Sequence, residues 1–197
     1  MVIATRNKKK KEEIVSILSD LKLRLYTLDE FENVPEVVED KDTLEGNAIK
    51  KAVEVALNIK KITLADDSGL EVDALDNRPG VHSARFAGQD QNDQANIDKL
   101  LKLLEGVPAG QRKARFRCVI ALAGPQGLID VVEGRCEGLI AFERKGEYGF
   151  GYDPVFIVPE YNKTFAELGR KIKDKISHRA LALQAAREII LKAAEKY

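Results

Sequence analysis

The stretch that decides the fold is residues 113–136, KARFRCVIALAGPQGLIDVVEGRC. In its first half apolar residues alternate with basic ones, which is the period of a half-buried β-strand. Residues 124–127, Gly-Pro-Gln-Gly, have the composition of a turn, and 128–136 returns as a second strand. The stretch therefore predicts an antiparallel β-hairpin.

Outside this hairpin, predicted helices and strands follow one another. Apolar residues recur at i, i+3, i+4 and i+7 around Ile14–Leu21, at 43–60 and at 91–105, which predicts three helices. A last helix begins near Ser177, a good N-cap residue. The predicted fold class is α/β with a mixed sheet. Further strands are predicted at 2–5, 23–28, 62–65, 138–143 and 154–158, and a long loop at 76–90.

Composition excludes several classes of protein. The 197 residues allow one large domain or two small ones. The chain has 32 basic residues (Lys and Arg) and 32 acidic residues (Asp and Glu). This lack of a basic excess argues against a nucleic-acid binder. No apolar run approaches the roughly 18 residues of a membrane span. Cys118 and Cys136 form no CxxC pair, so we expect reduced, packed thiols in a cytoplasmic protein and no zinc site.

The first candidate for chemistry is Thr5-Arg6-Asn7-Lys8-Lys9-Lys10, at a predicted strand-to-helix junction. A helix start offers N–H groups without partners and a partial positive charge. Together with a hydroxyl, an amide and ammonium groups, these are suited to a phosphate chain. The alternative is that Asn7 only caps the helix and that the lysines form a solvated face.

Acidic residues gather at two places. Asp66-Asp67-Ser68-Gly69 follows a predicted buried strand, where open α/β sheets place their sites. Paired carboxylates there suit Mg²⁺, although the same tetrapeptide is also common as an Asx turn or a helix cap. Glu36, Glu39 and Asp40 form a further acidic patch before the second helix, or else an ordinary acidic first turn of that helix.

Two later segments combine glycine, aromatic and basic residues. Residues 149–154, Gly-Phe-Gly-Tyr-Asp-Pro, bring backbone and ring close to a flat base, or else form a plain turn. The second segment is Ser177-His178-Arg179, which follows Lys173 and Lys175. It either binds the polar edge of a base or an anion, or it is an exposed, capped helix start. Basic groups, carboxylates and an aromatic glycine loop together favour an enzyme acting on a magnesium-bound nucleotide.

These segments resemble the inosine triphosphate pyrophosphatase family, also called the XTP/dITP diphosphatases. The resemblance implies one elongated, two-lobed domain over 1–197, with a mixed twisted sheet flanked by helices and a central cleft. It further implies a cytoplasmic homodimer that hydrolyses ITP, dITP and XTP to the monophosphate and pyrophosphate and so cleanses the nucleotide pool. The resemblance spans nearly the whole chain, in the family's order, through residues 5–10, 43–52, 65–72, 79–88, 150–154 and 176–179.

Carried over residue by residue, the resemblance implies a division of roles. Asp67 would accept the proton of the attacking water, and Glu39 and Asp67 would hold Mg²⁺, with Asp40 as the alternative to Glu39. The chemistry of the bases adds that a donor from Arg179, His178 or a backbone N–H would pair with the keto oxygen at purine position 6, where adenine carries a donor. Substrate would be bound by Thr5, Arg6, Asn7, Lys8, Lys9, Lys10, Lys51 and Ser68 on the phosphate side, and by Phe150, Gly151, Tyr152, Asp153, Lys173, His178 and Arg179 on the base and sugar side.

Two other functions stay open. One is a pyrophosphatase for modified pyrimidine or methylated nucleotides, built on a similar fold. The other is a regulatory nucleotide- or RNA-binding protein without turnover, although the zero net charge weakens the RNA version. The sequence departs from the family at two places: the family often has Gly where Arg6 stands, and Gly and Phe where Asp42 and Leu44 stand. Neither departure alters an expected ligand, but Arg6 would change the shape of the phosphate loop.

Overall fold

The fold was taken from a computed structural model, which describes residues 1–196. The chain divides into two compact units. Unit 1 comprises Met1–Asp67, Cys118–Gly134 and the residues from His178 onward, and unit 2 comprises Ser68–Arg117 and Arg135–Ser177. The single domain expected over the whole chain stays a prediction.

The strands form a mixed sheet in the order β2-β1-β3-β5-β6-β7-β8, with β4 paired to β3. Strand β1 pairs in parallel with β2 and β3, whereas β3 pairs antiparallel with β4, and β7 antiparallel with β6 and β8. The predicted α/β class with a mixed sheet is therefore confirmed. The strands are β1 (Val2–Ile3), β2 (Tyr26–Thr27), β3 (Thr63–Val72), β4 (Arg78–Pro79), β5 (Lys113–Gly124), β6 (Gly127–Ile140), β7 (Phe156–Val158) and β8 (Lys163–Thr164).

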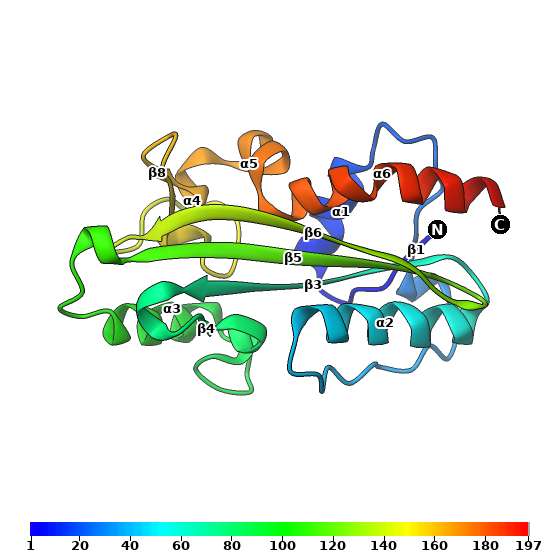
Figure 1. Cartoon of the computed structure of the whole chain (residues 1–197), viewed down its shortest axis with the longest axis horizontal. Coiled ribbons are helices and arrows are strands. Elements are labelled where there is room, and N and C mark those ends of the chain that lie inside the picture. Colours follow the sequence, from blue (N-terminus) through cyan, green and yellow to red (C-terminus); the bar gives the residue numbers. More distant parts are fainter. Residues whose placement is uncertain (197) are drawn as a thin grey trace. The chain divides into compact units, whose positions relative to one another are not determined.

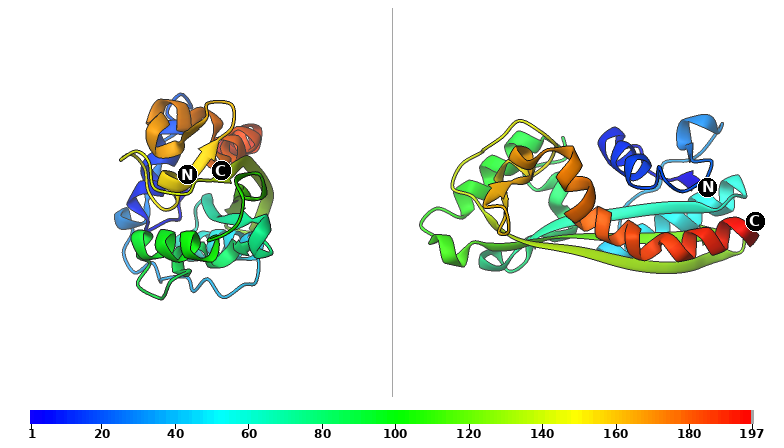
Figure 2. Two further views of the ribbon diagram at one scale, coloured as in Figure 1. Left: turned by 90° about the vertical axis from the view of Figure 1, so that its left-hand side faces the viewer. Right: turned by 90° about the horizontal axis from the view of Figure 1, so that it is seen from above.

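Unit 1 has helices on both faces of its strands. Helices α1 (Lys8–Ile17) and α6 (His178–Lys196) lie on one face and α2 (Leu44–Ile59) lies on the other (Figure 1). Figure 2 shows α6 running along the hairpin of β5 and β6. Gly134 permits this approach, because a Cβ there would lie 2.2 Å from the backbone nitrogen of Ala182. The core beneath α1 and α6 includes Ile3, Ile14, Leu18, Leu64, Ile120, Leu183 and Ile190.

Unit 2 packs α3 (Asp93–Leu103) on one face of its strands, and α4 (Phe165–Leu168) and α5 (Arg170–Ile176) on the other (Figure 1). The Phe156 and Phe165 rings stack with centroids 5.4 Å apart at the centre of this core. Its short 3₁₀ helices are η2 (Asp73–Leu75), η3 (Gly80–Arg85), η4 (Ala109–Gln111) and η5 (Asp153–Val155), and unit 1 has η1 (Leu28–Glu30).

The structure corrects the predicted end of one strand. A strand was expected only over 62–65, but β3 continues to Val72, so Asp66-Asp67-Ser68-Gly69 lies inside a strand and forms no turn or cap. This tetrapeptide has the composition of a loop, yet its two carboxylates are buried. They are tolerated there because cationic and amide side chains meet them, as polar groups in an interior require.

Other predicted elements hold with smaller changes. The helices expected at 43–60 and 91–105 are confirmed as α2 and α3, and the hairpin is confirmed as β5 and β6. The strand expected at 23–28 contracts to two residues, and the one at 138–143 is the end of β6. The loop expected at 76–90 contains β4 and η3.

Both cysteines are free and buried, as expected. Burial raises the pKa of each thiol to about 12, so both stay protonated and inert at neutral pH. Within residues 1–196, no helix combines the length and the apolar character that crossing a membrane demands.

Candidate active site

The segment between β1 and α1 is organised by Asn7. Its Oδ1 accepts the backbone N–H groups of Lys9 at 3.0 Å and Lys10 at 3.1 Å, and its own N–H donates to Thr5 Oγ1 at 3.2 Å. Asn7 is therefore the N-cap of α1, which was one of the two interpretations of this segment. The cap fixes the direction in which the first turn presents its lysines.

The basic residues of this segment point to different places. Lys8 and Lys9 are exposed, and Arg6 donates to the backbone carbonyl of Val34 at 3.0 Å. Lys10 turns inward, and its Nζ lies 3.1 Å from Asp66 Oδ2. Of these four cations, Lys10 is the one that the fold holds beside a buried carboxylate.

Asp66 lies at the centre of a buried acid–base cluster in unit 1. Besides Lys10, it binds Arg179, whose Nη2 lies 3.1 Å from Asp66 Oδ2. The same guanidinium also pairs with Glu13 through Nη1. Asp66 and Arg179 are 0% and 1% exposed, so these charges interact with little screening by water.

The cluster is held in its charged form. Burial alone would raise the pKa of Asp66, but Lys10 and Arg179 outweigh it and hold that pKa well below its ordinary value. Burial likewise opposes the charge on Lys10, but Asp66 raises the Lys10 pKa overall. Asp66 Oδ1 has no hydrogen-bond partner among residues 1–196. A buried carboxylate oxygen in this state is well suited to accept a further donor or cation.

Asp67, the next residue of β3, is in a different electrostatic state. Successive side chains of a strand point to opposite faces, so the two carboxyl groups have different hydrogen-bond partners, although the charges of Lys10 and Lys51 act on both. Its Oδ2 accepts the side-chain amide of Asn47 from α2 at 3.2 Å. Burial, reinforced by the charges of Glu39 and Asp66, raises its pKa above the ordinary value, although two lysines oppose the shift. A raised pKa brings a carboxylate closer to what a general base needs near neutral pH.

Glu39 and Asp40 differ in their surroundings. Glu39 pairs with Lys51 of α2, and its charge raises the pKa of Asp67. Asp40 is exposed and pairs with Lys50, whose Nζ lies 2.9 Å from Oδ1. Of the two acidic residues, Glu39 is therefore the one that lies in electrostatic contact with Asp67.

The donors near Asp67 fit Mg²⁺. This cation takes oxygen ligands and is usually held by one or two carboxylates together with substrate phosphates. Glu39 and Asp67 supply two such carboxylates. Over residues 1–196, His, Cys, Asp and Glu form no group of three or more that could hold a metal without other ligands. The chain thus offers a partial ligand set, which a bound phosphate chain would complete.

Unit 2 contains a second cluster, around Phe150. Lys173 Nζ lies 2.5 Å from Asp153 Oδ2, and both side chains are almost fully buried. The same Nζ lies 4.5 Å from the centroid of the Phe150 ring, and the Phe150 N–H donates to Asp153 Oδ2 at 2.9 Å. Gly149 has a φ of +86°, and a Cβ there would lie 2.0 Å from Asp153 Oδ2. The structure therefore brings Phe150, Asp153 and Lys173 together as a group.

His178 and Arg179 belong to unit 1, and Arg179 contacts Asp66 and Glu13. The residues expected to bind the base and sugar therefore fall into two separate sets of contacts, one in each unit. The interpretation of 177–179 as an exposed helix start is wrong, because Ser177, His178 and Arg179 are 1%, 4% and 1% exposed. Ser68 follows Asp67 in β3, is partly exposed and falls in unit 2.

Sequence reasoning missed two residues of these clusters. Glu13 lies three positions after Lys10 on α1, next to the buried Ile14, and a carboxylate on the apolar face of a helix was a signal for a buried partner. Asn47 lay within a matching stretch but was given no role. Its Oδ1 accepts the Lys41 N–H at 2.9 Å while its amide donates to Asp67.

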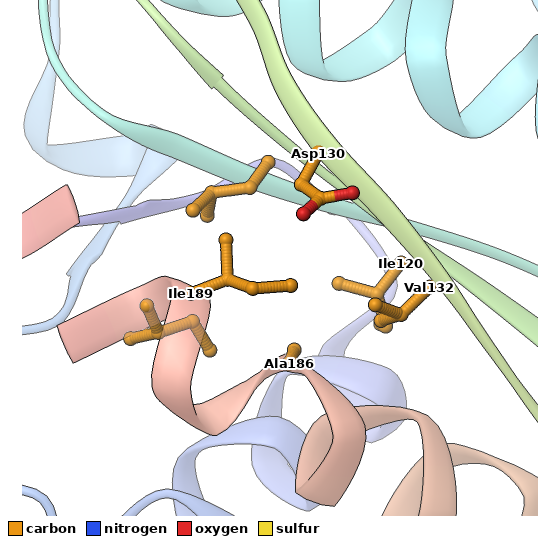
Figure 3. Close-up of a pocket in the computed structure, with 7 residues that line it drawn as sticks. Ile120, Asp130, Val132, Ala186 and Ile189 are labelled. Atoms are coloured by element: carbon orange, nitrogen blue, oxygen red, sulfur yellow. The ribbon is translucent and has the colours of Figure 1, made fainter. Parts of the chain in front are cut away.

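A pocket in unit 1 lies between the β5–β6 hairpin and α6 (Figure 3). Its lining has no cationic side chain that would bind a phosphate, and it contains none of the predicted site residues. It is therefore no candidate for the active site. The lining residues are Ile120, Leu122, Asp130, Val132, Ala186, Ile189 and Ile190.

The mixed α/β fold thus holds a buried lysine–carboxylate cluster beside further carboxylates in unit 1, and the comparisons with known proteins say which class of protein has this fold. The sequence model of the Ham1 family matches residues 1–189. The chain therefore belongs to the Ham1 family.

Named relatives cover almost the whole chain. The chain is 55% identical over 190 residues to the dITP/XTP pyrophosphatase of Desulforamulus reducens. This match covers 96% of the chain and 94% of the relative. It is 40% identical to a HAM1 protein from Coxiella burnetii, with a TM-score of 0.88 and 98% of each chain covered. It is 42% identical to a nucleoside-triphosphatase, or dITP/XTP pyrophosphatase, from Mycobacterium abscessus. That match has a TM-score of 0.76 and covers 93% of this chain and 95% of the other. The family resemblance predicted from the sequence is confirmed.

Proposed function

We propose that this chain is an enzyme that hydrolyses non-standard purine nucleoside triphosphates, namely dITP, XTP and ITP, to the monophosphate and pyrophosphate. The names of its relatives support the substrate class. The observation within the chain that carries the proposal is the pair of adjacent carboxyl groups in β3 with opposite pKa shifts. Such a pair is typical of sites in which one carboxylate organises charge and the other moves a proton.

The reaction cuts the bond between the α-phosphorus and the oxygen that bridges to the β-phosphorus. A water oxygen forms a new bond to the α-phosphorus, and the bridging oxygen leaves with pyrophosphate. Asp67 accepts the proton of this water, for which its raised pKa is suited. Lys10 and Lys51 stabilise the negative charge that develops on the departing pyrophosphate.

Glu39 and Asp67 would hold Mg²⁺ together with oxygens of the triphosphate. The ion neutralises phosphate charge when bound. Lys51 pairs with Glu39 in the structure. When a cation and a triphosphate bind there, two contacts would replace this ion pair: Glu39 would bind the cation, and Lys51 would bind the triphosphate. Asp66 stays ionised between Lys10 and Arg179 and keeps both cations directed toward the same region of unit 1.

On the base side, Phe150 would stack on the purine. Its ring is partly exposed, and Lys173 lies 4.5 Å from its centroid. Asp153 neutralises Lys173 and binds the Phe150 N–H, so the ring is held by two contacts. Arg179 would donate to the keto oxygen at position 6 while Glu13 and Asp66 hold its guanidinium.

The proposal is tested by pyrophosphate release with Mg²⁺ from ITP, dITP and XTP, compared with ATP, dUTP and dTTP. We expect kcat/KM for the keto purines to exceed that for ATP by about 10²-fold or more, because a site that pairs with the keto oxygen leaves donors unpaired when adenine enters. The products should be pyrophosphate and the monophosphate. Faster turnover of dUTP or dTTP would point to a pyrimidine enzyme, and binding of ITP without turnover to a regulatory protein.

The homodimer implied by the family resemblance is also a proposal. Light scattering on the eluted peak of a size-exclusion column tests it directly. A mass near twice 21.9 kDa is expected, and a mass near 21.9 kDa contradicts it.

A further inference from the structure

Helix α3 binds the backbone of two loops of unit 2 through side chains on one of its faces. Asn96, three positions after Asp93, accepts the Ala87 N–H at 2.6 Å through Oδ1 and donates to the Ala84 carbonyl at 3.0 Å through Nδ2. Lys99, three positions further, donates to the carbonyl of Phe86 at 2.5 Å. Residues at this spacing are neighbours on a helix surface. Ile97 and Leu100 of the same helix lie in the core of unit 2.

Asp93 binds the loop that carries Phe150. Its Oδ2 accepts the backbone N–H of Gly151 at 2.8 Å. Burial, with the charge of Asp93 as a further cause, raises the pKa of the neighbouring Tyr152 phenol. An anionic acceptor makes the stronger kind of hydrogen bond to a backbone N–H, so this contact is a firm attachment of α3 to the loop.

Tyr152 attaches the same loop at a second point. Its phenol donates to the backbone carbonyl of Ser83 at 2.9 Å, and Tyr152 is 5% exposed. Ser83 in turn accepts the Leu70 N–H through Oγ at 2.8 Å, which ties η3 to β3. The Phe150 loop is thus fastened at the two residues that follow Phe150, Gly151 to α3 and Tyr152 to η3, which is itself held to β3.

We propose that Asp93 is a positioning residue for substrate binding: by holding the Gly151 N–H, it fixes the direction in which Phe150 presents its ring to the purine. This inference rests on the proposed function, in which Phe150 stacks on the base. In the proposed role Asp93 contacts neither the substrate nor the metal. Its loss should therefore weaken binding of the base and leave the chemistry at the phosphates unchanged.

The test compares Asp93→Ala with Asp93→Asn in ITP hydrolysis. Asp93→Ala removes the acceptor, and KM for ITP should rise about tenfold, equivalent to about 1.4 kcal/mol, with kcat within twofold of wild type. Asp93→Asn keeps an acceptor oxygen, so KM should return to within about threefold of wild type. Asp98→Ala is the control, because Asp98 lies on the same helix but pairs with the Arg144 side chain.

Inorganic tripolyphosphate separates a positioning role from a general loss of structure. It has phosphates but no base, so its inhibition constant should be the same for wild type and Asp93→Ala. An unchanged KM for ITP in Asp93→Ala overturns the inference, and so does an equal rise of KM and of the tripolyphosphate inhibition constant. If wild-type enzyme releases no pyrophosphate from ITP, the proposed function itself is at fault.

Discussion

Asp66 and Asp67 are neighbours in β3, yet their carboxyl groups have pKa values shifted in opposite directions. Both are buried, so desolvation raises both. Asp66 receives two cations at 3.1 Å, which reverses the effect of burial. Asp67 accepts an amide at 3.2 Å, and the charges of Lys10 and Lys51 lower its pKa, but these do not overcome burial together with the repulsion of Glu39 and Asp66. The alternation of side chains along a strand is what separates the two environments.

The first prediction is that two isosteric substitutions at these neighbours change stability in opposite directions at pH 7 in EDTA. Asp66→Asn removes the anion between two buried cations, which costs about 3–5 kcal/mol and lowers Tm by on the order of 10 °C. Asp67→Asn removes a carboxylate whose ionised form is disfavoured by folding, so it should raise Tm by a few degrees. Thermal unfolding followed by circular dichroism measures both, and a shift of the same sign in both variants contradicts the electrostatic assignment.

The dependence of this effect on pH follows from the directions of the two shifts. The folded-state pKa of Asp66 lies below its unfolded value of about 3.9, so its stabilisation is complete above that value and is lost as pH falls toward the folded-state pKa. The folded-state pKa of Asp67 lies above its unfolded value, so its ionised form destabilises above the folded pKa and ceases to do so below about pH 3.9. The advantage of Asp67→Asn should therefore disappear in acid.

The second prediction concerns turnover. Asp67→Asn should lower kcat for ITP by at least about 10²-fold, because the amide cannot accept the proton of the attacking water. Asp90→Asn, at an exposed position, is the matched control and should keep wild-type activity. The measurement is pyrophosphate release at saturating ITP and Mg²⁺. Near wild-type turnover by Asp67→Asn would remove this residue from the mechanism.

The third prediction decides between Glu39 and Asp40 as metal ligand. Glu39→Gln should raise the Mg²⁺ concentration for half-maximal activity by about tenfold or more, because it removes one of two carboxylate ligands of a hard cation. Asp40→Asn should leave this concentration unchanged, because Asp40 pairs with Lys50 and is exposed. Titration of activity with Mg²⁺ at fixed ITP measures both. The reverse order of the two variants would transfer the ligand role to Asp40.

The sequence was sufficient to predict elements whose apolar pattern is periodic. Helix α3 and the β5–β6 hairpin follow directly from spacing, because apolar residues recur at the helical and strand periods on their buried faces. It was insufficient for β3, where Asp66 and Asp67 are buried only because Lys10, Arg179 and Asn47 come to them from α1, α6 and α2. Nothing local in Asp-Asp-Ser-Gly distinguishes such a strand from a turn.

The candidate site shows the same limit. The motif residues from Thr5 to Lys10 were identified, but the inward direction of the Lys10 side chain depends on Asn7 capping α1 and on the buried Asp66 of β3. Glu13 and Asn47 were missed because each acts through a contact distant in sequence, 166 positions to Arg179 and 20 to Asp67. A single sequence contains the residues but not these pairings.

The fourth prediction concerns base selection by Arg179. Lysine at this position keeps a positive charge beside Glu13 and Asp66 but loses the planar fork of donors. One lost contact to the keto oxygen corresponds to about 1–3 kcal/mol. Arg179→Lys should therefore lower kcat/KM for ITP by about tenfold or more and change the already low value for ATP little, so that the ITP/ATP ratio moves toward unity.

The matched control for Arg179→Lys is Arg187→Lys, on the same helix, where the arginine pairs with Asp20 at the surface. That variant should keep both the activity and the ITP/ATP ratio. The decisive measurement is the ratio, because damage to the acid–base cluster lowers turnover of every substrate alike. If Arg179→Lys lowers kcat/KM for ITP and ATP by the same factor, Arg179 acts through Asp66 on the phosphate chemistry. The discrimination between keto and amino bases would then have to arise in the loop from Phe150 to Asp153.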